Sequence, residues 1–248
     1  MTKTPARHLP LEGSFNIRDL GGYHTADGQT TLWGKVFRAD SLHRLTADSQ
    51  ALLLKQGIRT VVDLRHASEL EAAPNPFADH PEVRYLHVSL FEPLYRGGSL
   101  GGGNRAGLEL TELYRLALEH ARDPIARVLT VIAESDAPVL FHCTAGKDRT
   151  GLIAALTLAA VGVESDTIVT DYALTGEYAR PLMAHLEAEA QAKGHDLGQY
   201  RKLLLSEPEF MQKTLEHLEA AHGSPRAYLE AIGLSEETLA GLRQQLLS

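Results

Sequence analysis

Residues 138–151 read PVLFHCTAGKDRTG, which is the most informative stretch of the sequence. Its first four residues form a short apolar run, which predicts a buried β-strand. A tight loop follows over His142 to Arg149, and the apolar run Thr150 to Val161 predicts a buried helix. A strand, a tight loop and a helix in this order direct the N–H groups of the helix N-terminus toward an anion. The stretch therefore predicts an α/β fold with an anion-binding loop.

Strands and helices alternate over the rest of the chain. Short apolar or alternating segments predict strands over Lys35 to Ala39, Arg59 to Leu64 and Val83 to Leu90. Apolar residues at helical spacing predict helices over Thr46 to Gln56, Leu110 to His120 and Ile125 to Ser135, and the C-terminal third from Ala179 is typical of several amphipathic helices. Such alternation indicates a largely parallel sheet. The sequence shows no repeat and no Pro/Ser-rich linker, so we predict a single domain over residues 1–248.

The chain of 248 residues is acidic, with 24 Lys and Arg against 32 Asp and Glu and a formal charge of −8. An acidic chain is a poor candidate for binding nucleic acid or anionic membranes, because both require a basic face. The longest apolar run, Leu152 to Val163, is shorter than the roughly 20 residues that span a bilayer. The first residues are also not followed by the apolar segment that a secretory signal peptide contains. We therefore predict a cytoplasmic protein with no nucleic-acid partner and no stable membrane insertion.

Cys143 is the only cysteine of the chain. An internal disulfide, a CxxC redox pair and a zinc site built on several thiolates are therefore excluded. The 12 histidines are scattered without the HExxH spacing of a metalloprotease, so we expect neither a metal nor another cofactor.

The anion-binding loop is not a nucleotide-binding loop. Gly146 and Lys147 are similar to part of a Walker A motif, which would also require glycine at 141 and serine or threonine at 148. Phe141 and Asp148 stand at those positions, so the spacing excludes that motif. What remains is a cysteine, five residues and an arginine between a strand and a helix.

That spacing suits a phosphate group. A loop of this size can turn successive backbone N–H groups toward one tetrahedral oxyanion, and the helix dipole adds positive potential. Arg149 offers a planar fork for two phosphate oxygens. The same dipoles, with Lys147 and Arg149, stabilise the thiolate form of Cys143. A thiolate beside a bound phosphate predicts covalent catalysis through a phosphocysteine, whereas the alternative, an inert buried thiol, explains neither the spacing nor the cations.

The loop HCTAGKDRTG resembles the Cys-x5-Arg signature of the cysteine-dependent protein tyrosine phosphatase superfamily, and GKDRT resembles its bacterial and fungal tyrosine/phosphoinositide phosphatase family. The resemblance extends over most of the chain. It includes the segment FNIRDLGG over residues 15–22, FRAD over 37–40, VDLR over 62–65, and the end from Gly223 to Leu234. Arg18, Asp19 and Arg38 lie in these segments, and a mutual ion pair explains them as well as a place in the pocket.

The resemblance implies a central parallel sheet of four or five strands flanked by helices. It implies Cys143 as the nucleophile and no metal. Arg149 and the loop amides would bind the phosphate group, and phosphate or sulfate is expected to bind in this loop; the amides are those of Thr144, Ala145, Gly146, Lys147 and Asp148. Thr150 would donate a hydrogen bond to the Cys143 sulfur, and His142 would position the loop.

A general acid is needed because an alkyl or tyrosyl oxygen leaves more readily when it is protonated. Where many members of the family have an aspartate after the strand corresponding to Val83 to Leu90, this chain has Glu92, which makes Glu92 the first candidate. Asp148 in the loop is the second candidate. The glycine-rich segment Gly97 to Gly107 closely follows Glu92 and is interpreted as a flexible surface loop, or alternatively as a lid. Asp63 is expected to pair with a neighbouring arginine or to cap a turn.

The predicted function is hydrolysis of a phosphomonoester on a phosphorylated protein or a phosphoinositide. Lys147 resembles the cations with which lipid phosphatases hold the extra phosphates of an inositol ring. A phosphotyrosine would require an apolar wall, for which Tyr23, Phe91 and Tyr95 are candidates. The alternative function is that of a pseudophosphatase that captures phosphoproteins without turnover. A third alternative is a sulfurtransferase or an arsenate reductase, whose loops also surround an oxyanion at a cysteine. A reductase with an internal disulfide would need further cysteines, which the chain lacks.

Overall fold

A five-stranded sheet forms the centre of this computed structural model, which describes residues 6–92, 94, 109–192, 194 and 196–247. The strand order is β1-β2-β5-β3-β4. Strands β2, β5, β3 and β4 are parallel, and β1 pairs antiparallel with β2. The bounds of the strands are β1 Arg18–Asp19, β2 Val36–Ala39, β3 Thr60–Asp63, β4 Arg84–His87 and β5 Val139–His142. The predicted α/β fold with a mostly parallel sheet is therefore confirmed.

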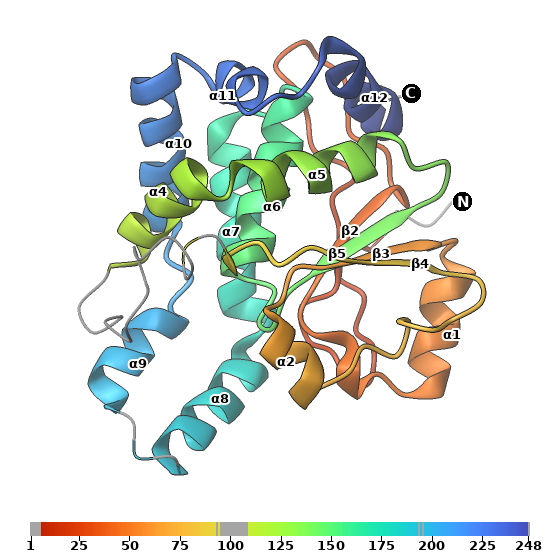
Figure 1. Cartoon of the computed structure of the whole chain (residues 1–248), viewed down its shortest axis with the longest axis vertical. Helices are drawn as coiled ribbons and strands as arrows, with labels where there is room; N and C mark the ends of the chain where they lie inside the picture. Colours follow the sequence, from red (N-terminus) through yellow and green to blue (C-terminus); the bar gives the residue numbers. More distant parts are fainter. Residues whose placement is uncertain (1–5, 93, 95–108, 193, 195, 248) are drawn as a thin grey trace.

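Helices cover both faces of the sheet. In Figure 1, α1 and α2 lie below the sheet, α5 and α6 lie above it, and α8 and α9 extend away from it. The bounds are η1 Leu42–Arg44, α1 Ala47–Lys55, α2 Ala67–Ala72, α4 Leu110–His120, α5 Arg122–Ala133, α6 Asp148–Ala160, α7 Ser165–Tyr178, α8 Arg180–Ala192, α9 Leu197–Leu204, α10 Pro208–His222, α11 Pro225–Ala231 and α12 Glu236–Leu247. The predicted helical C-terminal third is present as α8 to α12. None of the described helices is long and apolar enough to cross a membrane.

Successive residues of β5 face opposite sides of the sheet and join two apolar cores. Val139 and Phe141 belong to the larger core, under α5 and α6, whereas Leu140 belongs to the smaller core beside α1. Because the side chains of a strand alternate between its faces, a strand that is buried on both sides is apolar at every position. This explains the continuous run that marked the strand in the sequence.

The strand register sets the place of the site. Ala39 of β2 and Asp63 of β3 both pair with His142, the last residue of β5. The three parallel strands therefore end at the same level, and the loops that follow them meet at one edge of the sheet. In open α/β sheets the carboxyl ends of the strands are where ligands bind.

Helix α6 begins at Asp148, two residues before the expected start. Residues 150–158 are all buried, so the apolar pattern revealed the body of the helix. Asp148 and Arg149 are polar and belong to the site, which hid the first turn from a pattern of apolar residues. The helix dipole therefore begins inside the predicted anion-binding loop itself.

Strand β1, the short helix η1 and helices α2 and α7 were not predicted. Strand β1 has only two residues, and α2 has six residues, none of them buried. Helix α2 is held by its cap, because His66 N donates to the Glu69 carboxylate and the His66 side chain accepts from Ser68 N. Histidine is not one of the usual N-cap residues, so the sequence carried no recognisable start signal for α2. The glycine-rich segment Gly97 to Gly107 lies outside the described residues.

Candidate active site

The loop between β5 and α6 has its carbonyl groups bonded and its N–H groups unbonded. Ser41 N donates to Thr144 O at 3.0 Å, and His142 Nδ1 donates to Cys143 O at 3.1 Å. Within the described part of the chain, the N–H groups of residues 144–148 donate no hydrogen bond. Cys143 lies at the start of this loop with 2% of its surface exposed. The loop has the geometry of an oxyanion cradle beside a thiol.

Arg149 in the first turn of α6 is held by Glu69 of α2. Its NH1 and NH2 groups donate to the Glu69 carboxylate at 2.5 and 3.1 Å, and NH2 also donates to Thr144 Oγ1 at 3.1 Å. Thr144 Oγ1 in turn donates to Glu69. Burial lowers the pKa of Arg149, but the charge of Cys143 and the contacts with Glu69 outweigh it and raise that pKa above its usual value. The guanidinium group is therefore a permanent, oriented cation beside the thiol.

Burial alone would raise the pKa of Glu69, but the hydrogen bonds and charge of Arg149, with Thr144 and the His66 backbone, lower it from 4.5 to about 2. A lowered pKa stabilises the fold above the unfolded value, and that stabilisation is lost as the pH falls through the folded value. Glu69→Gln is therefore expected to lower the free energy of unfolding at pH 7, and the difference from wild type should narrow as the pH falls from 4.5 toward 2. Urea denaturation at several pH values measures it.

The matched control for this prediction is Glu71→Gln. Glu71 lies in the same helix and is exposed, so its substitution changes α2 without touching Arg149. If the free energy of unfolding depends on pH in the same way for both variants, the ion pair between Glu69 and Arg149 does not stabilise the fold.

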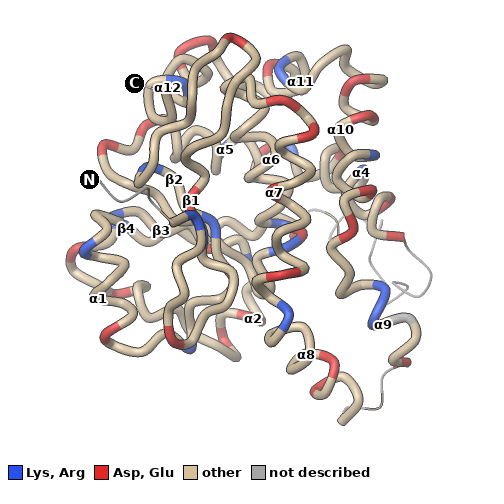
Figure 2. Tube along the Cα trace, turned by 180° about the vertical axis from the view of Figure 1, so that it is seen from behind, with Lys and Arg blue, Asp and Glu red and all other residues tan. Residues whose placement is uncertain are grey.

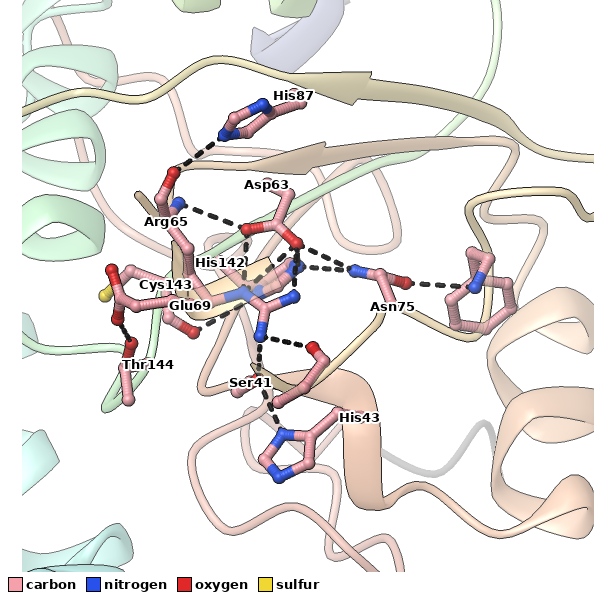
Figure 3. A network of polar contacts seen from close by, with 12 residues as sticks. Ser41, His43, Asp63, Arg65, Glu69, Asn75, His87, His142, Cys143 and Thr144 are labelled. Carbon is pink, nitrogen blue, oxygen red and sulfur yellow. Dashed lines mark hydrogen bonds and ion pairs between the residues drawn. The ribbon is translucent and has the colours of Figure 1, made fainter. Parts of the chain in front are cut away.

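Behind the loop lies a buried network centred on Asp63 (Figure 3). Asp63 pairs with Arg65 at 2.7 Å, which confirms the expected arginine partner. Its carboxylate also lies 3.2 Å from His142 Nε2 and accepts from Asn75 Nδ2 at 3.2 Å. Burial raises the pKa of Asp63, but the charges and hydrogen bonds of His142 and Arg65 lower it below its usual range. The carboxylate is thus an anion that fixes the strand end from which Cys143 emerges.

His142 positions the loop whichever charge it carries. Asn75 Nδ2 lies 2.8 Å from Nε2 of the ring, so a neutral imidazole accepts there and bears its proton on Nδ1. A protonated imidazole donates from Nε2 to Asp63 and still bears a proton on Nδ1. In both cases Nδ1 donates to the carbonyl oxygen of Cys143, in agreement with the positioning role that the resemblance implies.

Asp148 is the first residue of α6, and its carboxylate accepts a hydrogen bond from one of two adjacent buried tyrosines. Tyr114 Oη donates to Asp148 Oδ1 at 2.5 Å and lies 2.7 Å from Tyr172 Oη. Burial, with the charge of Asp148, raises the pKa of Tyr114 well above 10, so the phenol keeps its proton and acts as a donor. Lys147 Nζ lies 3.3 Å from the same carboxylate oxygen.

Glu92 lies beside α2. Its carboxylate is 2.7 Å from His66 Nε2, and its side chain is 27% exposed. The preceding residue, Phe91, is buried, and its ring centroid is 5.8 Å from the guanidinium carbon of Arg149. Glu92 is therefore connected to the site through Phe91 on one side and through the N-cap residue of α2 on the other.

Lys147 in the loop and Thr150 in the first turn of α6 have surroundings that the sequence did not indicate. Lys147 is buried, and its Nζ donates to Leu203 O and to Leu205 O, the latter at 2.9 Å. This contact satisfies the carbonyl groups at the end of α9. Thr150 Oγ1 is buried and has no hydrogen-bond partner among the described residues, so the hydrogen bond expected from it to the Cys143 sulfur is not formed.

The apolar candidates for a phosphotyrosine pocket separate in the structure. Phe91 lies against Arg149, as described above. Tyr23 instead donates from Oη to Asp171 Oδ1 at 2.8 Å, in a buried cluster with Arg18 and Arg38. Arg18 and Arg38 therefore share Asp171 rather than pairing with Asp19. Tyr95 lies outside the described residues.

Sequence reasoning missed several residues that hold the site together: Asn16, Glu69, Asn75, Tyr114 and Tyr172. Tyr114 lies on the apolar face of α4, where a tyrosine is indistinguishable from core, and Tyr172 lies in α7, which was not predicted. Glu69 lies in a helix without an apolar face. Glu69 stands three residues after the N-cap and completes a capping box, but the N-cap is a histidine, so the sequence did not reveal this box. Among the described residues, no group of three or more His, Cys, Asp or Glu side chains could hold a metal ion.

Comparison with known proteins shows the family of the chain. The sequence profile of the tyrosine phosphatase family matches residues 9–248. The chain is 30% identical to the triple specificity protein phosphatase PtpB of Mycobacterium tuberculosis, over 97% of this chain and 99% of that protein. It is 30% identical to a tyrosine-protein phosphatase of Nostoc commune, over 84% of this chain and 73% of that one. A solved structure of P. aeruginosa TpbA with pTyr is 16% identical, with a TM-score of 0.36, and covers 82% of this chain and 98% of that one.

A strand, a Cys-x5-Arg loop and a helix at the carboxyl edge of a parallel sheet define a cysteine-dependent phosphatase. The family match spans nearly the whole chain. The chain belongs to the tyrosine phosphatase family.

Proposed function

We propose that residues 1–248 form one phosphatase domain that hydrolyses phosphomonoesters through a phosphocysteine. The observation that carries this proposal is the loop, in which a thiol, an oriented guanidinium and unbonded N–H groups lie together. The Cys143 thiolate attacks phosphorus, and the bond from phosphorus to the ester oxygen breaks as that oxygen takes a proton from an acid. Water then attacks phosphorus and gives a proton to the carboxylate left by the acid, the bond from phosphorus to sulfur breaks, and inorganic phosphate and the thiolate are released. The N–H groups and Arg149 stabilise the charge that spreads over the phosphoryl oxygens.

Phosphotyrosine is the substrate that the surroundings of Arg149 support best. Phe91 supplies an apolar surface beside the guanidinium, and the relatives are named as tyrosine and triple specificity phosphatases. A phosphoinositide is the second candidate, favoured by Lys147 if its ammonium leaves the carbonyl groups of α9. Initial rates on phosphotyrosine peptides, phosphoserine peptides and phosphoinositides distinguish the two. If p-nitrophenyl phosphate is bound but not hydrolysed, the protein is instead a pseudophosphatase that captures phosphoproteins.

For the general acid we propose Asp148, with Glu92 as the alternative. Asp148 is adjacent to Arg149, and the donor on its Oδ1 directs the proton to Oδ2. The Glu92 carboxylate faces His66, which caps α2. A proton on the leaving oxygen matters most for a poor leaving group. The effect of each carboxylate should therefore depend on the ester.

Asp148→Asn is expected to slow hydrolysis of a phosphotyrosine peptide by ~10²–10⁴, the usual value for a positioned acid, and to slow that of p-nitrophenyl phosphate much less. Tyr114→Phe, which leaves the carboxylate in place but removes its donor, should reproduce the same selectivity at about tenfold. Steady-state kcat on both esters measures the effect.

The matched control is Tyr228→Phe, since Tyr228 is equally buried but donates to Leu118 O, away from the loop. It should leave the ratio of the two rates unchanged. If Glu92→Gln shows the leaving-group dependence and Asp148→Asn does not, Glu92 is the acid.

A further inference from the structure

Each carbonyl group of the phosphate loop from Cys143 to Gly146 accepts a hydrogen bond. The donors lie on the outer side of the loop, away from the side that would face a phosphate. Cys143 O and Thr144 O are served by His142 and Ser41, as described above. The carbonyl groups of Ala145 and Gly146 accept hydrogen bonds from residues in the N-terminal part of the chain. Asn16 Nδ2 donates to Ala145 O at 3.1 Å and to Gly146 O at 3.2 Å, and Arg38 NH2 donates to Gly146 O at 2.8 Å.

These two donors are themselves fixed. Asn16 N donates to Asp40 Oδ1 at 3.0 Å, and Asn16 Oδ1 accepts from Arg18 NH1. Arg38 NH1 donates to Asp171 Oδ2 at 2.5 Å. Both side chains are buried, Asn16 with no exposed surface and Arg38 with 1% exposed, and Figure 2 shows Lys and Arg positions gathered beside β1 and β2 in the middle of the molecule. Neither donor can turn away from the loop without leaving buried polar atoms unbonded.

A planar peptide unit transmits this arrangement to the substrate side. The carbonyl of one residue and the N–H of the next point in opposite directions. Holding Ala145 O and Gly146 O against Asn16 and Arg38 therefore turns the N–H groups of Gly146 and Lys147 to the opposite side, toward the position of a phosphoryl group.

Gly146 makes the close approach possible. Its φ is +67°, and a Cβ there would lie 2.6 Å from Ala39 O at the end of β2. Only glycine combines this backbone conformation with such contact. The loop can therefore lie within reach of Arg38, which precedes Ala39 on the same strand.

We infer that Asn16 and Arg38 are positioning residues of the phosphate loop, which set the peptide planes at 145–146 and 146–147 for oxyanion binding. The inference rests on the proposed function, because it assigns the origin of the oxyanion site which that function requires. Neither residue is a catalytic residue, since each acts through a loop carbonyl. Their effect should appear in oxyanion affinity rather than in fold stability alone.

The test is binding of inorganic phosphate, by isothermal titration calorimetry, to variants made in a Cys143→Ser background. Asn16→Asp keeps the size of the side chain and the acceptor for Arg18, but replaces a donor by an oxygen that faces two carbonyl oxygens. Arg38→Lys keeps the charge beside Asp171, but a single ammonium cannot reach both Asp171 and Gly146 O. Each change is expected to raise the Kd for phosphate about tenfold or more. With Cys143 present, the KM for p-nitrophenyl phosphate should rise by a similar factor.

Tyr23→Phe is the matched control. It removes a hydrogen bond to Asp171 from the same buried cluster but touches no loop carbonyl. It should lower the Tm and leave the phosphate Kd unchanged. Asn16→Ser serves in place of Asn16→Asp if the aspartate variant does not fold.

Phosphate affinities of the Asn16 and Arg38 variants equal to that of Tyr23→Phe would overturn the inference and leave the proposed function standing. A parent chain that neither binds phosphate nor hydrolyses p-nitrophenyl phosphate would overturn the proposed function, and this inference with it. Weaker phosphate binding in folded variants, with the control unchanged, supports the inference.

Discussion

Cys143→Ser is expected to lower kcat for p-nitrophenyl phosphate by roughly 10⁴-fold or more, while inorganic phosphate still binds. Serine keeps the shape of the side chain, but its hydroxyl is not ionised near neutral pH and cannot replace a thiolate nucleophile. The oxyanion cradle does not depend on sulfur, because its N–H groups and Arg149 are held by other contacts. Steady-state kinetics and phosphate titration on one preparation measure both quantities.

The single cysteine makes a chemical control possible. Any thiol alkylation of the wild-type chain reports on Cys143 alone. One equivalent of iodoacetate should therefore inactivate the enzyme, and inorganic phosphate should protect it. Residual turnover of a few per cent in Cys143→Ser would assign the nucleophile to another group.

Arg149→Lys is expected to lower kcat/KM by ~10²–10³, although the charge is kept. An ammonium can approach either the phosphoryl oxygens or Glu69, whereas the guanidinium in the structure already donates to Glu69 from both terminal nitrogens. Its remaining N–H groups are then left for the substrate in a fixed plane. The measurement is kcat/KM for p-nitrophenyl phosphate together with the Kd of inorganic phosphate.

Arg226→Lys provides the control for this change, since Arg226 is an exposed arginine that pairs with Glu230 and Glu236 far along the chain. It should be silent in both measurements. If Arg149→Lys retained near wild-type kcat/KM, the guanidinium would contribute only its charge.

What the sequence predicted was local. The strand, loop and helix around Cys143 are adjacent in the chain, and their apolar pattern and the Cys-x5-Arg spacing were sufficient to identify the nucleophile and the phosphate-binding arginine as candidates. The α/β class with a largely parallel sheet followed from the alternation of strands and helices.

What the sequence could not supply was the set of residues that holds the loop. Asn16 reaches Ala145 across 129 positions, and Glu69 reaches Arg149 across 80. No local pattern marks such partners, because their pairing depends on the order of β1, β2, β5 and β3 in the sheet. Lys147 shows the same limit. As a lysine in the loop it was expected to bind substrate, whereas in the fold its ammonium group donates to carbonyl groups at the end of α9.

The contacts of Lys147 and Asn16 also bear on how the chain acquires its activity. Asn16 connects the phosphate loop to the N-terminal part of the chain. Lys147 connects it to Leu203 and Leu205, which follow Lys147 by 56 and 58 positions. We expect contacts so distant in sequence to form late in folding, because closing a long intervening loop costs chain entropy before the contact can offset that cost. A chain still emerging from the ribosome without residues 203–248 already carries the whole Cys-x5-Arg signature, yet its Lys147 has no carbonyl groups to bind. The proposed nucleophile is thus synthesised well before the contacts that hold its loop are complete.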